Sequence, residues 1–536
     1  MKKDLAIDKV LKTLIIIIAI AILSFIVILN IRYEVTISIF EEHTNIQDMN
    51  ILKLLLCIIL GIVTVLITFV IKKLNISKKV KIITTILALG LYSFFQILWI
   101  KACLVKPGAD PGMIYGTAKL LFNNQDIMKE HILEYFSFYK QNIGLVVIYE
   151  RLMRFFNTDN VILFRYVNVV CNTITVLGLY WIYKMINDKE ENNTLLFYVL
   201  ILGFLPISLL STWVYGDFIG LSLGILSVAL IIKYVKSKKI RFLFFSSICM
   251  SIAIIARSNL LIFIIAITIY LIITLLKEKN RKERIVGILL IPLFIVISII
   301  PNKILTNYIS KKYQLDERKE KSIITYLYMG MSEGKMANGW YNDEIDTINN
   351  EMKKNNKDDN TIENQTKEKL SDRINYLLNN PLYTIWFYKY KILSMWAEPT
   401  MASEVYNSQR DVDMSENKIY NIVFDEQNFE AIKASQKVID GMIFVGALSY
   451  IILKRKNISN EVLLVILIFL GGFGFHILWE AKSRYIIPYV VILIPVATKG
   501  LNELCIYFIN KRNKEKNEKK EGCIDEKNKY NHTSIQ

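Results

Sequence analysis

Four short groups of residues stand at the ends of apolar runs in this sequence, and their side-chain types suit one kind of chemistry. The groups are Asp110, Trp213–Asp217, Arg257–Asn259 and Glu480–Tyr485. A carboxylate can accept a proton from a hydroxyl, and an arginine can hold a phosphate through two parallel hydrogen bonds and stabilise its charge as it leaves. If the groups meet at one membrane face, we expect a reaction between a lipid-borne anionic substrate and a hydroxyl acceptor.

Each group also has an ordinary explanation. Asp110 precedes a Pro-Gly pair, which is favourable turn chemistry. Arg257 and Arg484 adjoin long apolar runs and need a counter-ion, so a surface position alone explains them less well. Charged residues at helix ends commonly anchor a helix at the membrane surface, an explanation that suffices for Asp217, Glu480 and Lys482.

Long apolar runs separate these groups and indicate the environment of the chain. Of its 536 residues, 53% are hydrophobic, and many lie in uninterrupted runs such as 14–29, 54–71 and 462–478. Crossing a hydrocarbon core about 30 Å thick takes roughly 20 helical residues. We therefore predict an all-α polytopic membrane protein with about twelve transmembrane helices, near 12–31, 51–71, 83–104, 161–183, 195–212, 217–232, 242–256, 259–276, 285–303, 437–453, 461–479 and 485–509.

The formal charge of +17 follows the topology of the chain rather than marking a nucleic-acid surface. Basic residues gather between apolar runs, at 72–81, 233–241, 277–284, 454–456 and in the tail 510–536. Threading the chain with Met1 inside places all of these clusters on the cytoplasmic side. The sequence thus predicts a multi-pass protein of the cell membrane with both termini in the cytoplasm and no nucleic-acid partner.

Two regions interrupt the pattern of spans. Residues 105–160 contain amphipathic stretches and form a loop expected to lie in the outer interface. Residues 304–436 form a long polar segment, expected outside, in which the aromatic stretch Pro381–Trp396 is predicted as an interfacial helix. The predicted division is 1–303 for the N-terminal membrane region, 304–436 for the extracytoplasmic segment, 437–509 for the C-terminal membrane helices and 510–536 for the basic cytoplasmic tail.

The order of these features resembles the GT-C glycosyltransferases, in particular the bacterial, protein-mannosyltransferase-like members of family 39. The resemblance covers roughly residues 83–305 and 437–509 and depends on the order of several short motifs rather than on one specific motif. The matching stretches are Ala109–Leu121, Tyr139–Gly144, Phe164–Asn168, Pro206 with the Tyr215–Asp217 turn, Arg257–Asn259 and Ser483–Pro488. Two features depart from the family: Pro111 stands where many members carry a second acidic residue, and an additional pair of spans (12–71) precedes the loop.

This resemblance implies an activity and roles for particular residues. It implies transfer of a sugar from a polyprenyl-phosphate donor to an envelope glycan, lipid or protein, with Asp110 as catalytic base. Arg257 and Arg484 best match the positions that bind the lipid phosphate. The substrate-binding candidates are therefore Arg257, Arg484, Asp217, Lys482 and Tyr485. No cofactor is assigned, and participation of a divalent cation stays open.

Three other functions compete with this hypothesis. A transporter or flippase is disfavoured because the two halves show no clear repeat and no Gly/Pro-broken helix pair at corresponding positions. An envelope-glycan polymerase or ligase would need paired arginines in a large outer loop, and Arg373 and Arg410 do not decide the matter. A membrane scaffold would leave Asp110 and Arg257 unexplained.

Overall fold

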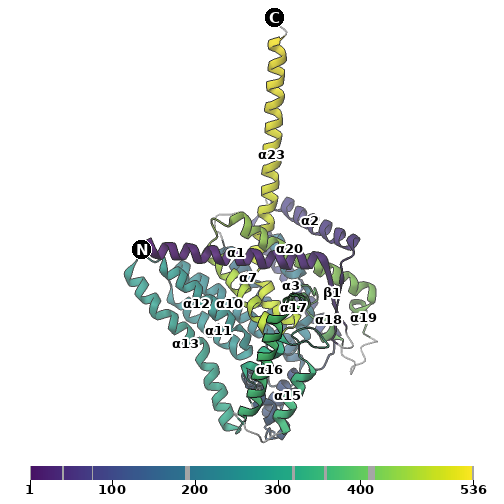
Figure 1. Cartoon of the computed structure of the whole chain (residues 1–536), viewed down its shortest axis with the longest axis vertical. Helices are drawn as coiled ribbons and strands as arrows, with labels where there is room; N and C mark the ends of the chain where they lie inside the picture. The colour runs from purple at the N-terminus through teal and green to yellow at the C-terminus, as the bar shows by residue number, and fades with distance from the viewer. Residues whose placement is uncertain are drawn as a thin grey trace.

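The computed structural model describes residues 2–38, 42–74, 77–186, 193–316, 320–354, 359–408 and 417–533. The protein is an all-α polytopic membrane protein, and 81% of it is helical. The N-terminus lies at one end of α1 (Lys2–Arg32), and the C-terminal part of α23 (Ile494–Thr533) projects away from the body (Figure 1).

Within these described ranges, nine helices are long and apolar enough to cross a membrane, or up to eleven if each of two bent helix pairs is one span. The nine lie in α1, α2 (Ile51–Lys72), α3 (Lys78–Ala102), α7 (Ile162–Met185), α10 (Asp217–Ser237), η3–α12 (Ser258–Leu276), α13 (Arg281–Lys312), α20 (Glu426–Lys454) and α21 (Asn460–Leu478). Each predicted span falls on a helix, because runs of apolar residues in hydrocarbon must satisfy their backbone groups internally. The remaining predicted span, 242–256, is the shorter helix α11 (Ile240–Ala256).

The two bent pairs correct the expectation of unbroken spans. Helix α8 (Thr194–Gly203) meets α9 (Leu205–Leu209) and η2 (Leu210–Thr212) at a 49° bend, with Pro206 in the first turn of α9. The last span bends by 59° between η5–α22 (Ser483–Val491) and α23. Because proline lacks the amide proton that a continuous helix needs, Pro206 and Pro495 account for the breaks at these places.

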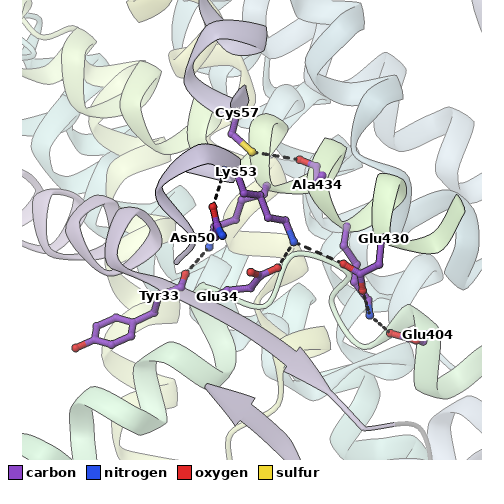
Figure 2. A network of polar contacts seen from close by, with 10 residues as sticks. Tyr33, Glu34, Asn50, Lys53, Cys57, Glu404, Glu430 and Ala434 are labelled. Carbon is purple, nitrogen blue, oxygen red and sulfur yellow. Dashed lines mark hydrogen bonds and ion pairs between the residues drawn. The ribbon is translucent and has the colours of Figure 1, made fainter. Parts of the chain in front are cut away.

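The segment after α1 contains a β-hairpin that the sequence did not predict. Strand β1 (Tyr33–Ile37) pairs antiparallel with β2 (Thr44–Asp48), and Val35 lies opposite Ile46. Figure 2 shows Glu34, Lys53, Glu404 and Glu430 where the hairpin meets α2 and α20. Together with Lys433 and Lys437, which contact Glu404, Glu430 and the Tyr33 backbone, we call them the hairpin cluster: Glu34, Lys53, Glu404, Glu430, Lys433 and Lys437.

The hairpin cluster holds distant elements together through paired charges. Lys53 Nζ contacts Glu34, and it lies 3.6 Å from Glu430 Oε2 on α20. Lys433 Nζ lies 3.1 Å from Glu430 Oε1 and 3.3 Å from Glu404 Oε2. The hairpin, α2 and α20 are thus fastened to one another beside the ends of three spans.

The long segment between α13 and α20 folds into several helices. They are α14 (Ile323–Met331), α15 (Asp343–Lys354), α16 (Asp359–Asn379), α17 (Pro381–Trp396), α18 (Ser403–Asn407) and α19 (Lys418–Phe424). Of these, α15 and α16 lie at the end of the molecule opposite the projecting part of α23, whereas α17, α18 and α19 lie nearer the middle, close to β1 (Figure 1). Helix α17 has the predicted bounds, but its last turns, from Lys391 to Trp396, are buried in the protein. The helices on either side extend into the predicted outer segment, since α13 continues to Lys312 and α20 already begins at Glu426.

Candidate functional site

Asp217 lies at the centre of a cluster built from three separate parts of the chain. Arg257 Nε lies 2.6 Å from Asp217 Oδ1, and Arg484 Nη1 binds Asp217 Oδ2. Trp213 Nε1 donates a hydrogen bond to Asp217 Oδ2 at 3.1 Å. Asp217 is the first residue of α10, where the helix dipole further stabilises its negative charge. We call Trp213, Tyr215, Asp217, Arg257 and Arg484 the Asp217 cluster.

Two glycines, Gly216 directly before α10 and Gly220 in its first turn, allow Arg257 to approach Asp217. A Cβ atom at Gly216 would lie 2.1 Å from the carbonyl oxygen of Ala256, and one at Gly220 would lie 2.9 Å from Arg257 Cβ. The end of α11 therefore packs directly against the start of α10, as small residues permit between membrane helices.

Helix α7 fixes the position of the turn between η2 and Asp217. Asn168 Nδ2 donates to the carbonyl oxygens of Ser211 at 3.0 Å and Trp213 at 2.8 Å. Arg165 donates to the carbonyl oxygen of Cys103 at 2.7 Å and to other carbonyl groups at the end of α3. The sequence stretch Phe164–Asn168 thus positions the Asp217 turn and the chain leading to Asp110.

Aromatic rings surround the two guanidinium groups. The Arg257 guanidinium lies 4.2 Å from the ring centre of Tyr215, and that of Arg484 lies 4.7 Å from Trp213 and 4.9 Å from Tyr406. Such contacts stabilise a cation that has left water. The side chains of Arg257, Asp217 and Arg484 are 18%, 22% and 6% exposed to solvent, so the cluster is largely buried but still reaches the surface.

Asp110 lies on the same side of the membrane and is joined to this cluster by hydrogen bonds. The Tyr135 hydroxyl donates to Asp110 Oδ1 at 2.8 Å, and Asn142 Nδ2 donates to the Tyr135 oxygen at 2.8 Å. The Tyr215 hydroxyl donates to Asn142 Oδ1 at 3.3 Å, and the Arg257 guanidinium lies over the Tyr215 ring. A continuous path of polar contacts therefore runs from Asp110 to Arg257.

Both tyrosines on this path remain protonated. Burial raises the pKa of Tyr135, and the adjacent carboxylate of Asp110 raises it further. Burial also raises the pKa of Tyr215, to about 12, although Arg257 opposes the shift. Each hydroxyl therefore acts as a hydrogen-bond donor at neutral pH.

Asp110 occupies the first turn of α4 (Ala109–Phe122), the helix that follows α3. Its neighbours on the path come from α5 (Glu130–Phe138) and from η1 (Lys140–Asn142), which leads into α6 (Ile143–Phe156). An acidic residue in the first turn of a helix is stabilised by the exposed amide groups there. The predicted interfacial loop thus folds as three short helices that place Asp110 half-buried beside the spans.

Of the remaining candidates, Lys482 has an extended backbone directly before η5, and Tyr485 lies within η5. The Tyr485 ring lies 5.6 Å from the guanidinium of Arg257 and 5.3 Å from that of Arg484, so it belongs beside the Asp217 cluster. Lys482 Nζ instead lies 3.4 Å from Glu42 Oε2 in the hairpin loop. Burial alone would lower the pKa of Lys482, but Tyr406, Glu42 and Glu480 outweigh it and raise the pKa.

The cavity at the Asp217 cluster is small. Its volume is about 30 Å³, and its lining includes Asp217, Arg257, Asn259, Arg484 and Tyr485. A cavity of this size holds no more than a water or two. In the part of the chain that the structure describes, no group of three or more His, Cys, Asp or Glu side chains is placed to hold a metal ion.

Sequence reasoning missed three residues near the site. Tyr135 and Tyr406 have no distinctive neighbours in the sequence, and only the packing of distant helices gives them their roles. Lys391 carried a signal, because it is a cation inside the aromatic stretch Pro381–Trp396. Its ammonium group donates to the carbonyl oxygens of Ile477 and Trp479, each at 2.8 Å, and of Gly330, which ties α17 to α14 and to the end of α21.

Comparison with known proteins identifies the family but no activity. The family model described as "conserved hypothetical integral membrane protein" matches residues 5–389, well over half of the chain. The chain therefore belongs to this family. No curated protein matches it.

Proposed function

We propose that this member of the conserved hypothetical integral membrane protein family is an inverting glycosyltransferase. It would take a sugar from a polyprenyl-phosphate carrier and pass it to a glycan, lipid or protein of the cell envelope. We also propose the orientation that the charge pattern predicts, with both termini in the cytoplasm and Asp110 at the outer face. The resemblance of the sequence to the GT-C glycosyltransferases of family 39 supports this assignment.

The observation that carries the proposal is a surplus of positive charge at the Asp217 cluster. Arg257 and Arg484 share the single carboxylate of Asp217, which leaves the cluster with a net charge of +1. A buried cation without a full counter-charge is costly, and an anion that binds there relieves the cost. The planar guanidinium groups suit a phosphate better than they suit a point charge.

In this reaction the acceptor hydroxyl attacks the anomeric carbon of the sugar. Asp110 takes the hydroxyl proton as the new carbon–oxygen bond forms. The bond between the anomeric carbon and the phosphate oxygen breaks, and the polyprenyl phosphate leaves with the electron pair. Arg257 and Arg484 stabilise the negative charge that develops on the phosphate.

The path from Asp110 to Arg257 fixes the position of the base relative to the arginines that would bind the phosphate. Tyr135 binds one oxygen of the Asp110 carboxylate and so sets its orientation, while the other oxygen can receive the proton. Asn142 and Tyr215 connect this orientation to the arginines. Because the cavity is small, we expect the donor's sugar and phosphate to enter by displacing Tyr406 and the neighbouring part of the outer segment.

The test is sugar transfer by the full chain in reconstituted membranes supplied with a panel of radiolabelled polyprenyl-phosphate sugars and an envelope extract as acceptor. We expect transfer by wild type and a loss of about 10²–10⁴-fold in Asp110→Asn, the usual contribution of a general base. Glu130→Gln is the matched control, an exposed acidic residue at the first turn of α5. If Asp110→Asn transferred sugar as fast as wild type, Asp110 would not be the general base.

A transporter or flippase is the second candidate, favoured by the two broken spans. Discontinuous helices are common where transporters bind their substrates, and both breaks lie near the Asp217 cluster: η2 leads to Trp213, and η5 contains Arg484. The same reconstituted membranes distinguish the two functions. Movement of labelled lipid between the leaflets without transfer of its sugar would support the transporter.

A further inference from the structure

A large cavity in the described part of the chain lies away from the Asp217 cluster. It has a volume of about 580 Å³ and lies between α4, α5, α6 and the end of α13. Its floor is apolar and includes Ile132, Phe136, Val146 and Ile309. Ligand cavities usually have volumes of about 300–1,000 Å³, so this groove can take a substantial part of a small molecule or a lipid chain.

The rim of the groove carries more positive than negative charge. Its charged residues are Arg151, Arg154, Lys312 and Glu150, so three cations face one carboxylate, for a net charge of +2. Glu150 contacts both arginines: its Oε2 lies 3.3 Å from Arg151 Nε, and its Oε1 accepts from Arg154. Arg154 is also held by the carbonyl oxygen of Leu121 at 2.9 Å. The side chain of Arg151 remains 75% exposed at the rim.

Two further features place the mouth of this groove at the membrane surface. Phe155 and Phe156 follow Arg154 and are 81% and 52% exposed, as expected for rings that enter lipid next to cationic side chains. Helix α13 has 32 residues. At 1.5 Å per residue it is about 48 Å long, which exceeds the roughly 30 Å hydrocarbon core. Its last turns, which carry Tyr308 and Lys312, therefore reach the level of the lipid head groups.

We propose that this groove binds an anionic glycerophospholipid from the leaflet on the Asp110 side. One acyl chain lies on the apolar floor between α5 and α6, and the phosphate lies between Arg151 and Lys312. The charge surplus selects an anionic head group over a zwitterionic one, since each cation near a membrane surface strengthens the binding of anionic lipid. The site is separate from the Asp217 cluster and does not depend on the proposed transfer reaction.

A bound lipid here would also brace the elements that carry Asp110. The groove is lined by Thr117 and Leu121 from the same helix as Asp110, and by Leu133 and Phe136, which flank Tyr135. Occupancy fills the space between α4 and α5 and so steadies the contact between Tyr135 and Asp110.

The test measures which lipid stays with the full-length protein. The protein is reconstituted in membranes of equal phosphatidylglycerol and phosphatidylcholine, extracted in mild detergent and examined by native mass spectrometry. We expect wild type to retain phosphatidylglycerol preferentially. The double variant Arg151→Ala/Lys312→Ala should lose this preference by about tenfold, because both phosphate contacts are removed.

Two further variants complete the test. Lys303→Ala/Lys311→Ala removes the same charge from exposed positions of α13 that do not line the groove, and it should keep the wild-type preference. Val147→Trp fills the groove without changing charge and should reduce retention of both lipids. Equal retention of the two lipids by wild type would overturn the proposal, as would an equal loss in the Lys303/Lys311 control. Retention of added polyprenyl phosphate in place of phosphatidylglycerol would also overturn it and assign the groove to the sugar donor.

Discussion

Two groups of charged residues on the Asp110 side look alike in composition but differ in charge balance. In the hairpin cluster Lys53 and Lys433 bind three glutamates across β1, α2, α18 and α20 (Figure 2). Lys437 binds the backbone oxygen of Tyr33, so the cluster contains three lysines and three glutamates. In the Asp217 cluster two arginines share one aspartate. The hairpin cluster is balanced within the chain, whereas the Asp217 cluster has one more cation than carboxylate; in the proposed function, the donor phosphate supplies the missing negative charge.

Their surroundings differ in the same way. Several aromatic rings surround each guanidinium group of the Asp217 cluster. In the hairpin cluster one ring, that of Phe429, lies near Lys433, and the lysines mainly bind backbone and carboxylate oxygens. We therefore expect substitutions in the Asp217 cluster to affect sugar transfer and substitutions in the hairpin cluster to leave it unchanged.

Asp217→Asn should have the largest effect on stability. The change leaves two largely buried guanidinium groups without a carboxylate, and breaking a buried ion pair in this way costs about 3–5 kcal/mol. Thermal unfolding of the purified protein measures the loss. A midpoint equal to that of wild type would show that the carboxylate is not the main counter-charge of the arginines.

Arg484→Lys should reduce sugar transfer by about 10²–10³-fold, the usual effect of removing one group that stabilises charge in the transition state. Lysine keeps the charge but loses the planar pair of donors. Initial rates at saturating donor are the measurement, and Lys433→Met in the hairpin cluster is the control, with wild-type rates expected. If Lys433→Met reduced the rate as strongly as Arg484→Lys did, the distinction between the clusters would fail.

Gly216→Ala should separate α10 from the end of α11, because the added Cβ would lie 2.1 Å from the Ala256 carbonyl oxygen. We expect a cost of about 1–3 kcal/mol in stability from overpacking. Gly90→Ala is the matched control, since a Cβ there meets no atom within 4 Å. Thermal unfolding measures both variants. If the unfolding midpoints of Gly216→Ala and Gly90→Ala fell equally, the close packing of α10 against α11 would not explain the effect.

Lys53→Met should have the smallest effect, at most about 1 kcal/mol, because its ion pairs are partly exposed to solvent. Sugar transfer should stay at the wild-type rate. Limited proteolysis of the hairpin measures any local loosening. A loss of transfer without unfolding would show that the hairpin cluster also takes part in the reaction.

Much of the fold follows from the sequence, and the reason is physical. Apolar runs long enough to cross hydrocarbon must be helical, so each predicted span falls on a helix of the structure. The bends near Pro206 and Pro495 were not predicted, because a proline permits a break but the packing of neighbouring helices determines whether the chain bends. The hairpin at Tyr33–Asp48 also escaped prediction, since its strands are short and alternate only weakly.

The candidate site was predictable only in part. The need of Arg257 and Arg484 for a counter-ion could be read from their apolar neighbours, and Asp217 supplies it. The path through Tyr135 and Asn142 could not be read in this way, because these residues acquire their partners from helices far away in the sequence. The catalytic role of Asp110 stays a prediction.

The most direct test of the central claim is a cryo-electron microscopy structure of the full chain with a polyprenyl phosphate bound in a lipid nanodisc. We predict density for the phosphate within hydrogen-bonding distance of the Arg257 and Arg484 guanidinium groups, with Tyr406 displaced and Asp110 facing the same space. Phosphate density elsewhere, with both arginines still bound only to Asp217, would contradict the claim that this cluster is the site of the lipid phosphate.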